Sequence, residues 1–267
     1  MDIYFSCMFF IFGLIFGSFY NVCAYRLPKK ESLLFPSSHC PNCNHVLNWY
    51  ELIPVFSYLI QRGKCRNCKA PISPFYMVFE LLTGIMFMLS YIVFGLSMKT
   101  VIAITFVSML DIIIISDILY TIINDSILVI FGLLLFFEKF AFNLMELDYI
   151  TIKYAMDELL NVCLNGLIPF MIMYLIKIVG DFMFKRESMG GGDIKLMAIL
   201  GIVIGAFNAV SCIFIAAFIA LPISIILLKI KSTHEIPFGP FLSLAAILLF
   251  FLEINVIDFL KIWFYAI

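Results

Sequence analysis

The chain has 267 residues, of which 64% are hydrophobic and only 13% are charged, and its mean hydropathy is +1.09. This composition excludes an ordinary soluble domain and indicates that most of the chain lies in lipid. The net charge of −1, with the basic residues segregated by loop, argues against a nucleic-acid partner, which would need a basic face.

Eight apolar stretches are candidates for membrane helices, because a helix needs about 20 residues to cross the hydrocarbon core. They are continuously apolar, whereas the strands of a membrane barrel alternate apolar and polar residues. We therefore expect an all-α polytopic membrane protein with about eight transmembrane helices. The stretches are residues 3–25, 75–94, 101–120, 126–142, 159–178, 194–207, 209–228 and 238–252. The fourth and sixth are the short or interrupted ones.

The first stretch is expected to remain as an amino-terminal anchor, since no Lys or Arg precedes it and its apolar run is too long for a removable signal. With the amino terminus outside, 13 of the Lys and Arg residues fall on the inner side and 4 on the outer side. The positive-inside rule favours this orientation. The predicted domains are the anchor (1–25), a Pro-rich cytoplasmic insert (26–74) and a transmembrane bundle (75–267), with an outer loop over 143–158 and an inner loop over 179–193.

Four of the eight cysteines lie in the insert, as two Cys-x-x-Cys pairs separated by 21 residues. Each pair places two thiolates on one tight turn, and two such turns complete a tetrahedral site of the kind that zinc prefers. The predicted ligands of a structural zinc ion are Cys40, Cys43, Cys65 and Cys68. A closed four-thiolate site leaves no position for substrate, so its role would be to hold together an insert that has little core of its own.

Two disulfides are the competing interpretation of these pairs, but the predicted orientation puts the thiols in the reducing cytosol. His39 and His45 flank the first pair and are either alternative ligands or solvated loop residues. The remaining cysteines stand singly in apolar stretches and are expected to be small core residues. They are Cys7, Cys23, Cys163 and Cys212.

Carboxylates within apolar stretches are costly and indicate either function or a buried partner. Asp117 and Asp193 fall at the inner ends of their segments in the predicted topology, so they can meet. Two adjacent carboxyl groups do not both ionise easily, which provides an acid and a base in one site, as in aspartic proteases. The glycines at 190–192 allow unusual backbone conformations and close approach of a substrate strand.

Each of these features also has a structural explanation. Asp117 can cap a helix or pair with a lysine, Asp193 can cap the following helix, and three glycines can be only a loop. From the residues alone, a proton or cation relay in a transporter is a close alternative to an aspartyl pair.

The ordered motifs resemble the bacterial type IV prepilin leader peptidases, including the form that also methylates its product. The resemblance covers nearly the whole chain. Its motifs are Gly17-Ser18-Phe19, Asn21-Val22, Tyr25-Arg26-Leu27-Pro28, residues 36–43 and 49–54, the second cysteine pair, residues 79–84, residues 190–195 and Pro237-Phe238-Gly239-Pro240.

This resemblance implies that Asp117 and Asp193 are the catalytic aspartates, with Gly190, Gly191 and Gly192 shaping the cleft. Asp193 closes the family's Gly-x-Gly-Asp motif. Asp117 stands eight residues before Asp125, as the family requires, although Asn124 replaces the usual proline. Asp111 is a minor competitor, and helical geometry points it in a different direction from Asp117.

The resemblance further implies cleavage of type IV prepilins or pseudopilins at the cytoplasmic face of the bacterial inner membrane. Methylation of the new amino terminus by S-adenosylmethionine would follow. Glu80 and Gly84 match a stretch that the family links with methyl transfer, and their structural alternatives are a paired carboxylate and a helix-packing glycine. No glycine-rich cofactor turn supports this second activity independently.

Two rival functions are a transporter in which the carboxylates relay protons or cations, and a noncatalytic membrane scaffold that binds a partner through the insert. Paired inverted halves, which are common in transporters, are not seen in the sequence. The sequence does not indicate an oligomeric state, a particular pilin substrate or the roles of Asp111 and Asp125.

Overall fold

The computed structural model describes residues 2–146, 151–230 and 237–253. All regular elements in these ranges are helices, and the only β-structure is two isolated bridges in the insert. The helices form two compact units, Met1–Ser116 and Asp117–Ile267. The predicted all-α class is confirmed. The boundary between the units falls inside a helix, so the three-part domain division remains a prediction.

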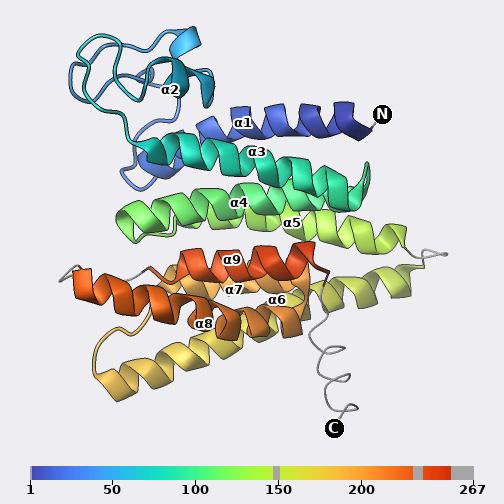
Figure 1. Cartoon of the computed structure of the whole chain (residues 1–267). Helices are drawn as coiled ribbons and strands as arrows, with labels where there is room; N and C mark the ends of the chain where they lie inside the picture. The colour runs from blue at the N-terminus through green and yellow to red at the C-terminus, as the bar shows by residue number, and fades with distance from the viewer. Residues whose placement is uncertain (1, 147–150, 231–236, 254–267) are drawn as a thin grey trace. The chain divides into compact units, whose positions relative to one another are not determined.

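Each predicted apolar stretch is helical over most of its length, and the sixth, 194–207, is interrupted at Gly205 between two helices (Figure 1). The long helices are α1 (Asp2–Arg26), α3 (Pro74–Phe94), α4 (Met98–Tyr120), α5 (Asp125–Met145), α6 (Ile152–Phe184), α7 (Gly191–Ile204), α8 (Ala206–Ile230) and α9 (Gly239–Phe251). Six of them are long and apolar enough to cross a membrane; α7 and α9 are shorter. At about 1.5 Å per residue, the 14 residues of α7 span less than the roughly 30 Å hydrocarbon core.

Two predicted loops differ from the structure in their extent. The outer loop predicted over 143–158 is wrong in extent, because α5 continues to Met145 and α6 starts at Ile152. The inner loop predicted over 179–193 is also shorter, since α6 continues to Phe184 and α7 already begins at Gly191. The charged residues in these stretches were expected to mark loops. Several of them lie in helices instead, because a long helix can extend beyond the lipid on both sides.

In the first unit, α1 and α3 approach closely along a line of small residues. A Cβ atom added at Gly13 would lie 2.7 Å from the Cα atom of Gly84, and one added at Gly17 would lie 2.9 Å from the Thr83 hydroxyl. Such glycines let helix backbones pack together where water provides no driving force. The insert between these helices has only short elements, the 3-10 helix η1 (Trp49–Glu51) and α2 (Phe56–Ile60). Long helices were not expected there.

In the second unit, α7 is the central helix and packs against α5, α6, α8 and α9. Pro169 lies inside α6 and has no N–H, so the carbonyl of Asn165 loses its helical donor. Gly201 of α7 packs at this point: a Cβ added to it would lie 2.0 Å from the Asn165 carbonyl oxygen. The Asn165 side chain also accepts the Ala206 N–H at 3.1 Å, at the start of α8.

The isolated cysteines only partly follow the prediction that they are core residues. Cys23 and Cys212 are buried, but Cys7 and Cys163 are exposed on the surfaces of α1 and α6. Apolar residues on the surface of a membrane bundle face lipid, so an apolar stretch does not predict which of its residues are buried in protein.

We expect Gly201→Ala to destabilise the second unit, because the new methyl group would overlap the Asn165 carbonyl and Pro169, at 2.0 and 2.5 Å. Overpacking of this kind costs about 1–3 kcal/mol. Gly132→Ala in α5 is the matched control, since its methyl group would meet only the flexible end of Ile199 at 3.1 Å. Thermal unfolding in detergent should give a lower midpoint for Gly201→Ala than for Gly132→Ala. Equal midpoints would contradict the packing argument.

Candidate active site

Asp117 lies in the last turn of α4 and only 5% of it is exposed. Its carbonyl accepts the N–H of Thr121 at 2.9 Å, and Thr121 has a φ of 52°, which ends the helix. Asn124 then caps α5 by accepting the Ser126 N–H at 2.8 Å. Asn124 stands where the family has a proline, and the capping bond provides another way to begin the next helix there.

Asp193 lies in the first turn of α7 and is also buried, with 8% of it exposed. The neighbouring Gly192 packs on Ile123, and Ile123 and Asp117 both lie against Gly239, so the two carboxyl groups are near enough for their charges to influence each other. Its Oδ1 atom has no hydrogen-bond partner among the described residues. The prediction that Asp193 caps the following helix by a side chain is not met, because Gly190 is the N-cap residue.

A third segment, the start of α9, completes this site. The backbone N–H of Gly239 donates a hydrogen bond to the Asp117 carboxylate. A Cβ atom at Gly239 would lie 2.6 Å from Asp117 Oδ2, and one at Gly192 would lie 2.6 Å from the Ile123 Cβ. Gly239 and Gly192 therefore permit the close approach of α7 and α9 to the segment that follows Asp117. The role of Gly239 was not predicted, although its motif was noted.

Asp125 and Lys195 form an ion pair of 2.7 Å between the start of α5 and the first turn of α7. Both side chains are largely exposed, so the pair contributes little to stability by itself. The ion pair connects the segment that follows Asp117 with the helix that carries Asp193. It gives Asp125 a structural contact, which the sequence did not indicate.

Asp111 belongs to a different polar group, in the first unit. It is buried, and its Oδ2 atom accepts a hydrogen bond from the Thr83 hydroxyl of α3 at 2.8 Å. Asp111 therefore has a partner away from Asp117, in agreement with the predicted difference in direction.

Glu80 connects α3 to the insert. Its Oε2 atom accepts the N–H of Val55 at 2.7 Å, and the Ser18 side chain also donates to it. Val55 has a φ of 61°, a strained conformation for a β-branched residue. Gly84, one turn further along α3, packs against α1: a Cβ added to it would lie 2.8 Å from Leu14 Cδ2.

The four insert cysteines form one cluster, in which all sulfur atoms lie within 4.8 Å of one another. The Cys40–Cys68 and Cys43–Cys65 sulfur distances are 3.8 and 3.9 Å. Tetrahedral coordination with metal–sulfur bonds of about 2.3 Å requires sulfur separations of roughly 3.8 Å, so the cluster has the right size for such an ion. No disulfide is present among these cysteines.

The two cysteine turns have nearly the same structure. In each, the first cysteine accepts an N–H four residues later, from Asn44 at 2.9 Å and from Lys69 at 3.0 Å, and both donors have positive φ. The third residue of each turn reaches across to the other: Asn42 donates to Cys68 at 3.5 Å and Asn67 to Cys43 at 3.7 Å. The repeated Cys-x-Asn-Cys pattern is the sequence signal for these asparagines, whose contacts were not predicted.

The pKa of the Cys68 thiol is lowered to about 6. The main cause is the hydrogen bond from the Asn42 side chain, and the second is a hydrogen bond from the Ala70 backbone. A thiolate at neutral pH is the form that binds a metal.

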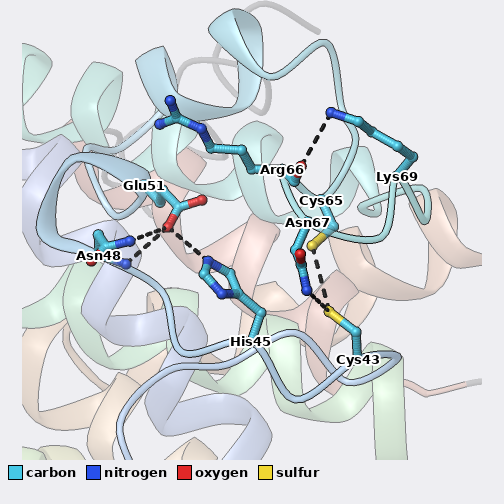
Figure 2. Close-up of polar contacts among 8 residues, drawn as sticks. All are labelled: Cys43, His45, Asn48, Glu51, Cys65, Arg66, Asn67 and Lys69. Atoms are coloured by element: carbon cyan, nitrogen blue, oxygen red, sulfur yellow. Dashed lines mark hydrogen bonds and ion pairs between the residues drawn. The ribbon is translucent and has the colours of Figure 1, made fainter.

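Neither histidine belongs to the cysteine cluster, and Figure 2 shows His45 directed toward Glu51. His45 instead lies 3.3 Å from Glu51 Oε2, which also accepts the backbone and side-chain N–H groups of Asn48 at 3.0 and 3.1 Å. His39 contacts the carbonyl of Ser37. The hydrogen bond from the Asn48 backbone is the main cause of a lowered pKa at Glu51.

Comparison with known proteins gives matches over most of the chain. Residues 11–94 match the model of the Bacterial Peptidase A24 N-terminal domain, and residues 104–225 match that of the Type IV leader peptidase family. A Prepilin leader peptidase/N-methyltransferase of Bacillus subtilis is 31% identical, over 94% of this chain and 95% of the relative. A protein of the same name from Vibrio cholerae is 28% identical, over 94% and 98%. No solved structure matches the chain.

We expect Glu51→Gln to destabilise the insert at pH 7 by about 1–3 kcal/mol, because the buried carboxylate loses charge-assisted hydrogen bonds. The pKa of Glu51 is lowered in the folded protein, so its contribution is complete above the unfolded value of about 4.3 and is lost as the pH falls through the folded value. The difference between wild type and variant should thus vanish in acid. Trp49 fluorescence during thermal unfolding, in a Trp263→Phe background, measures it. A difference independent of pH would contradict this account.

Proposed function

We propose that this chain, which belongs to the type IV leader peptidase family, removes the leader peptides of prepilins or pseudopilins and then methylates the new amino terminus. The observation that carries the peptidase assignment is the pair of buried, interacting carboxyl groups of Asp117 and Asp193. The names of the relatives support the substrate class and the second activity.

In this proposal one aspartate is ionised and the other holds a proton. The carboxylate removes a proton from a water molecule whose oxygen attacks the scissile carbonyl, while the carboxyl group donates its proton to the carbonyl oxygen. Gly190 is the N-cap of α7 and Gly191 and Gly192 are its first residues, so the start of this helix has no side chains that would hinder an extended substrate. Support for this role is the open space at Gly191, where an added Cβ atom would meet nothing within 4 Å, whereas Gly192 packs against Ile123.

The protein is proposed to be a multi-pass protein of the bacterial inner membrane, with its amino terminus outside and its insert and active site at the cytoplasmic face. The distribution of 13 basic residues inside and 4 outside supports this orientation. The aspartates lie in terminal turns of α4 and α7. That position suits a substrate that arrives from the aqueous side, whereas transporter sites typically lie at the midplane.

The second activity would use S-adenosylmethionine, which supplies a methyl group to an amine. We propose that Glu80 binds the cofactor at this site. Gly84 would support the site by allowing α1 to pack closely on α3. The Glu80 carboxylate is complementary to the positive sulfonium of the cofactor. Its hydrogen bond to Val55 would also hold the insert beside the site.

Asp117→Asn and Asp193→Asn should each abolish cleavage of a synthetic prepilin by purified enzyme, because either change removes the acid–base pair. Mass spectrometry of the product measures leader loss, and the melting temperature shows that the variants are folded. Asp111→Asn is the matched control and should keep cleavage, since Asp111 bonds to Thr83. A folded enzyme that cleaves normally without Asp117 or Asp193 would rule out the proposed pair.

The same mass spectra distinguish methylation from leader removal, since methylation adds mass to the cleaved product. Glu80→Gln should preserve leader removal and lose the methyl group, and glutamine can still accept the Val55 N–H through its carbonyl oxygen. A fully methylated product from this variant would exclude Glu80 from methyl transfer.

We also propose that the metal held by the four cysteines is zinc. Cys65→Ser should reduce bound zinc, measured by mass spectrometry of the metal, from one ion per chain to near none, whereas Cys163→Ser on the surface of α6 should retain it. Strong acidification should release the ion, because protons compete with the metal for the four thiolates. Full metal retention by Cys65→Ser would contradict the assignment.

A further inference from the structure

The two carboxyl groups of the proposed active site have unequal surroundings. Asp117 accepts a hydrogen bond from the backbone N–H of Gly239, at the first residue of α9. Asp193, with 8% of its surface exposed, has an Oδ1 atom without a partner among the described residues. An ionised carboxylate needs donors when it is buried, whereas a protonated carboxyl group is less costly to bury.

Within the first turn of α9, Gly239 is the residue whose N–H has no partner in the helix backbone. The N–H groups of Phe241 and Leu242 both bond to the Phe238 carbonyl at 3.1 Å, and Pro240 has no N–H. Gly239 is therefore the residue of this first turn whose N–H is free for Asp117. The partial positive charge at the amino terminus of a 13-residue helix adds to the stabilisation of a negative charge there.

Gly239 is also required by the available space. A Cβ atom at this position would lie 2.6 Å from Asp117 Oδ2 and 3.2 Å from Ile123 Cδ1. Any side chain would push the carboxylate away from the N–H group, so the hydrogen bond depends on glycine.

We infer that Gly239 is a positioning residue that keeps Asp117 ionised as the general base and leaves the shared proton on Asp193, the general acid. This inference rests on the proposed peptidase function and assigns the two roles within it.

The proton movements then follow. Asp117 takes a proton from water as the water oxygen bonds to the scissile carbonyl carbon, and Asp193 gives its proton to the carbonyl oxygen. When the tetrahedral intermediate collapses, Asp117 returns its proton to the leaving nitrogen as the C–N bond breaks. Asp193 recovers a proton from the hydroxyl group that becomes the new carbonyl, so both residues end as they began.

Among the described residues, three other charged side chains at the starts of α5 and α7 and near the end of α6 have polar partners. Asp125 and Lys195 bind each other at 2.7 Å, and Asp181 at the end of α6 accepts hydrogen bonds from Ser188. The helix α9 has no titratable side chain over Gly239–Phe251. A shift in the pH profile after a change at Gly239 thus reports on the aspartyl pair.

The test is Gly239→Ala, with cleavage of a synthetic prepilin measured as a function of pH. We expect kcat/KM to fall about tenfold or more, the usual effect of losing a hydrogen bond to a charged group. The acidic limb of the profile should move to higher pH, since the ionised base is less stable without its donor. Damage to packing alone would lower the rate without moving that limb.

Two controls keep normal rates and an unshifted profile. Gly132→Ala adds the same methyl group in α5, against the flexible end of Ile199, and Ser243→Ala removes a buried hydroxyl of α9 that has no hydrogen-bond partner in the described part of the chain. If Gly239→Ala does not fold, replacement of the Gly239 amide by an ester removes the N–H and adds no atom that clashes. The ester variant should show the same shift.

An unshifted acidic limb in the ester variant, or a shift of the basic limb instead, would overturn the assignment of roles. These outcomes differ from failure of the proposed function, which would appear as cleavage that persists in Asp117→Asn or Asp193→Asn.

Discussion

Burial of two neighbouring carboxyl groups among apolar helices is costly, and this cost is the constraint on the second unit from which the other features of the site follow. A charge in such a place needs donors or a proton. Here one donor comes from the backbone at the start of α9, and the approach of that backbone depends on a missing side chain at Gly239. Gly192 allows a similar approach at the start of α7. The missing side chains of these glycines thus determine how closely backbone groups approach the carboxyl groups.

Much of this architecture could be predicted because lipid imposes simple rules. Long apolar stretches must be helices, and every predicted stretch is helical over most of its length. Helix ends were less predictable, because charged residues such as Lys153 and Asp181 are compatible with a helix that extends out of the membrane. The length of α6 was underestimated for this reason. Burial of single residues was unpredictable too, since lipid-facing and protein-facing positions are equally apolar.

The site itself was predicted as a list of residues but not as a geometry. The spacing of Asp117 and Asp193 along the chain did not indicate what each one would bond to. The Gly239 donor came from a third segment, and no residue pattern connects it to α4. The cysteine cluster was more accessible to prediction, because two turns of fixed geometry determine the positions of four sulfur atoms. Even there, the crossed contacts of Asn42 and Asn67 appear only when the two turns are folded together.

The helix α4 links the two halves of the chain in an unusual way. The matched family models are separated by residues 95–103, whereas the compact units divide within α4, between Ser116 and Asp117. Most of the helix that carries Asp117 therefore belongs to the other unit. A gene split to make two complementing fragments should be cut at the short turn around Gly95, because a break at the unit boundary would leave one aspartate at a fragment end with no helix to hold it.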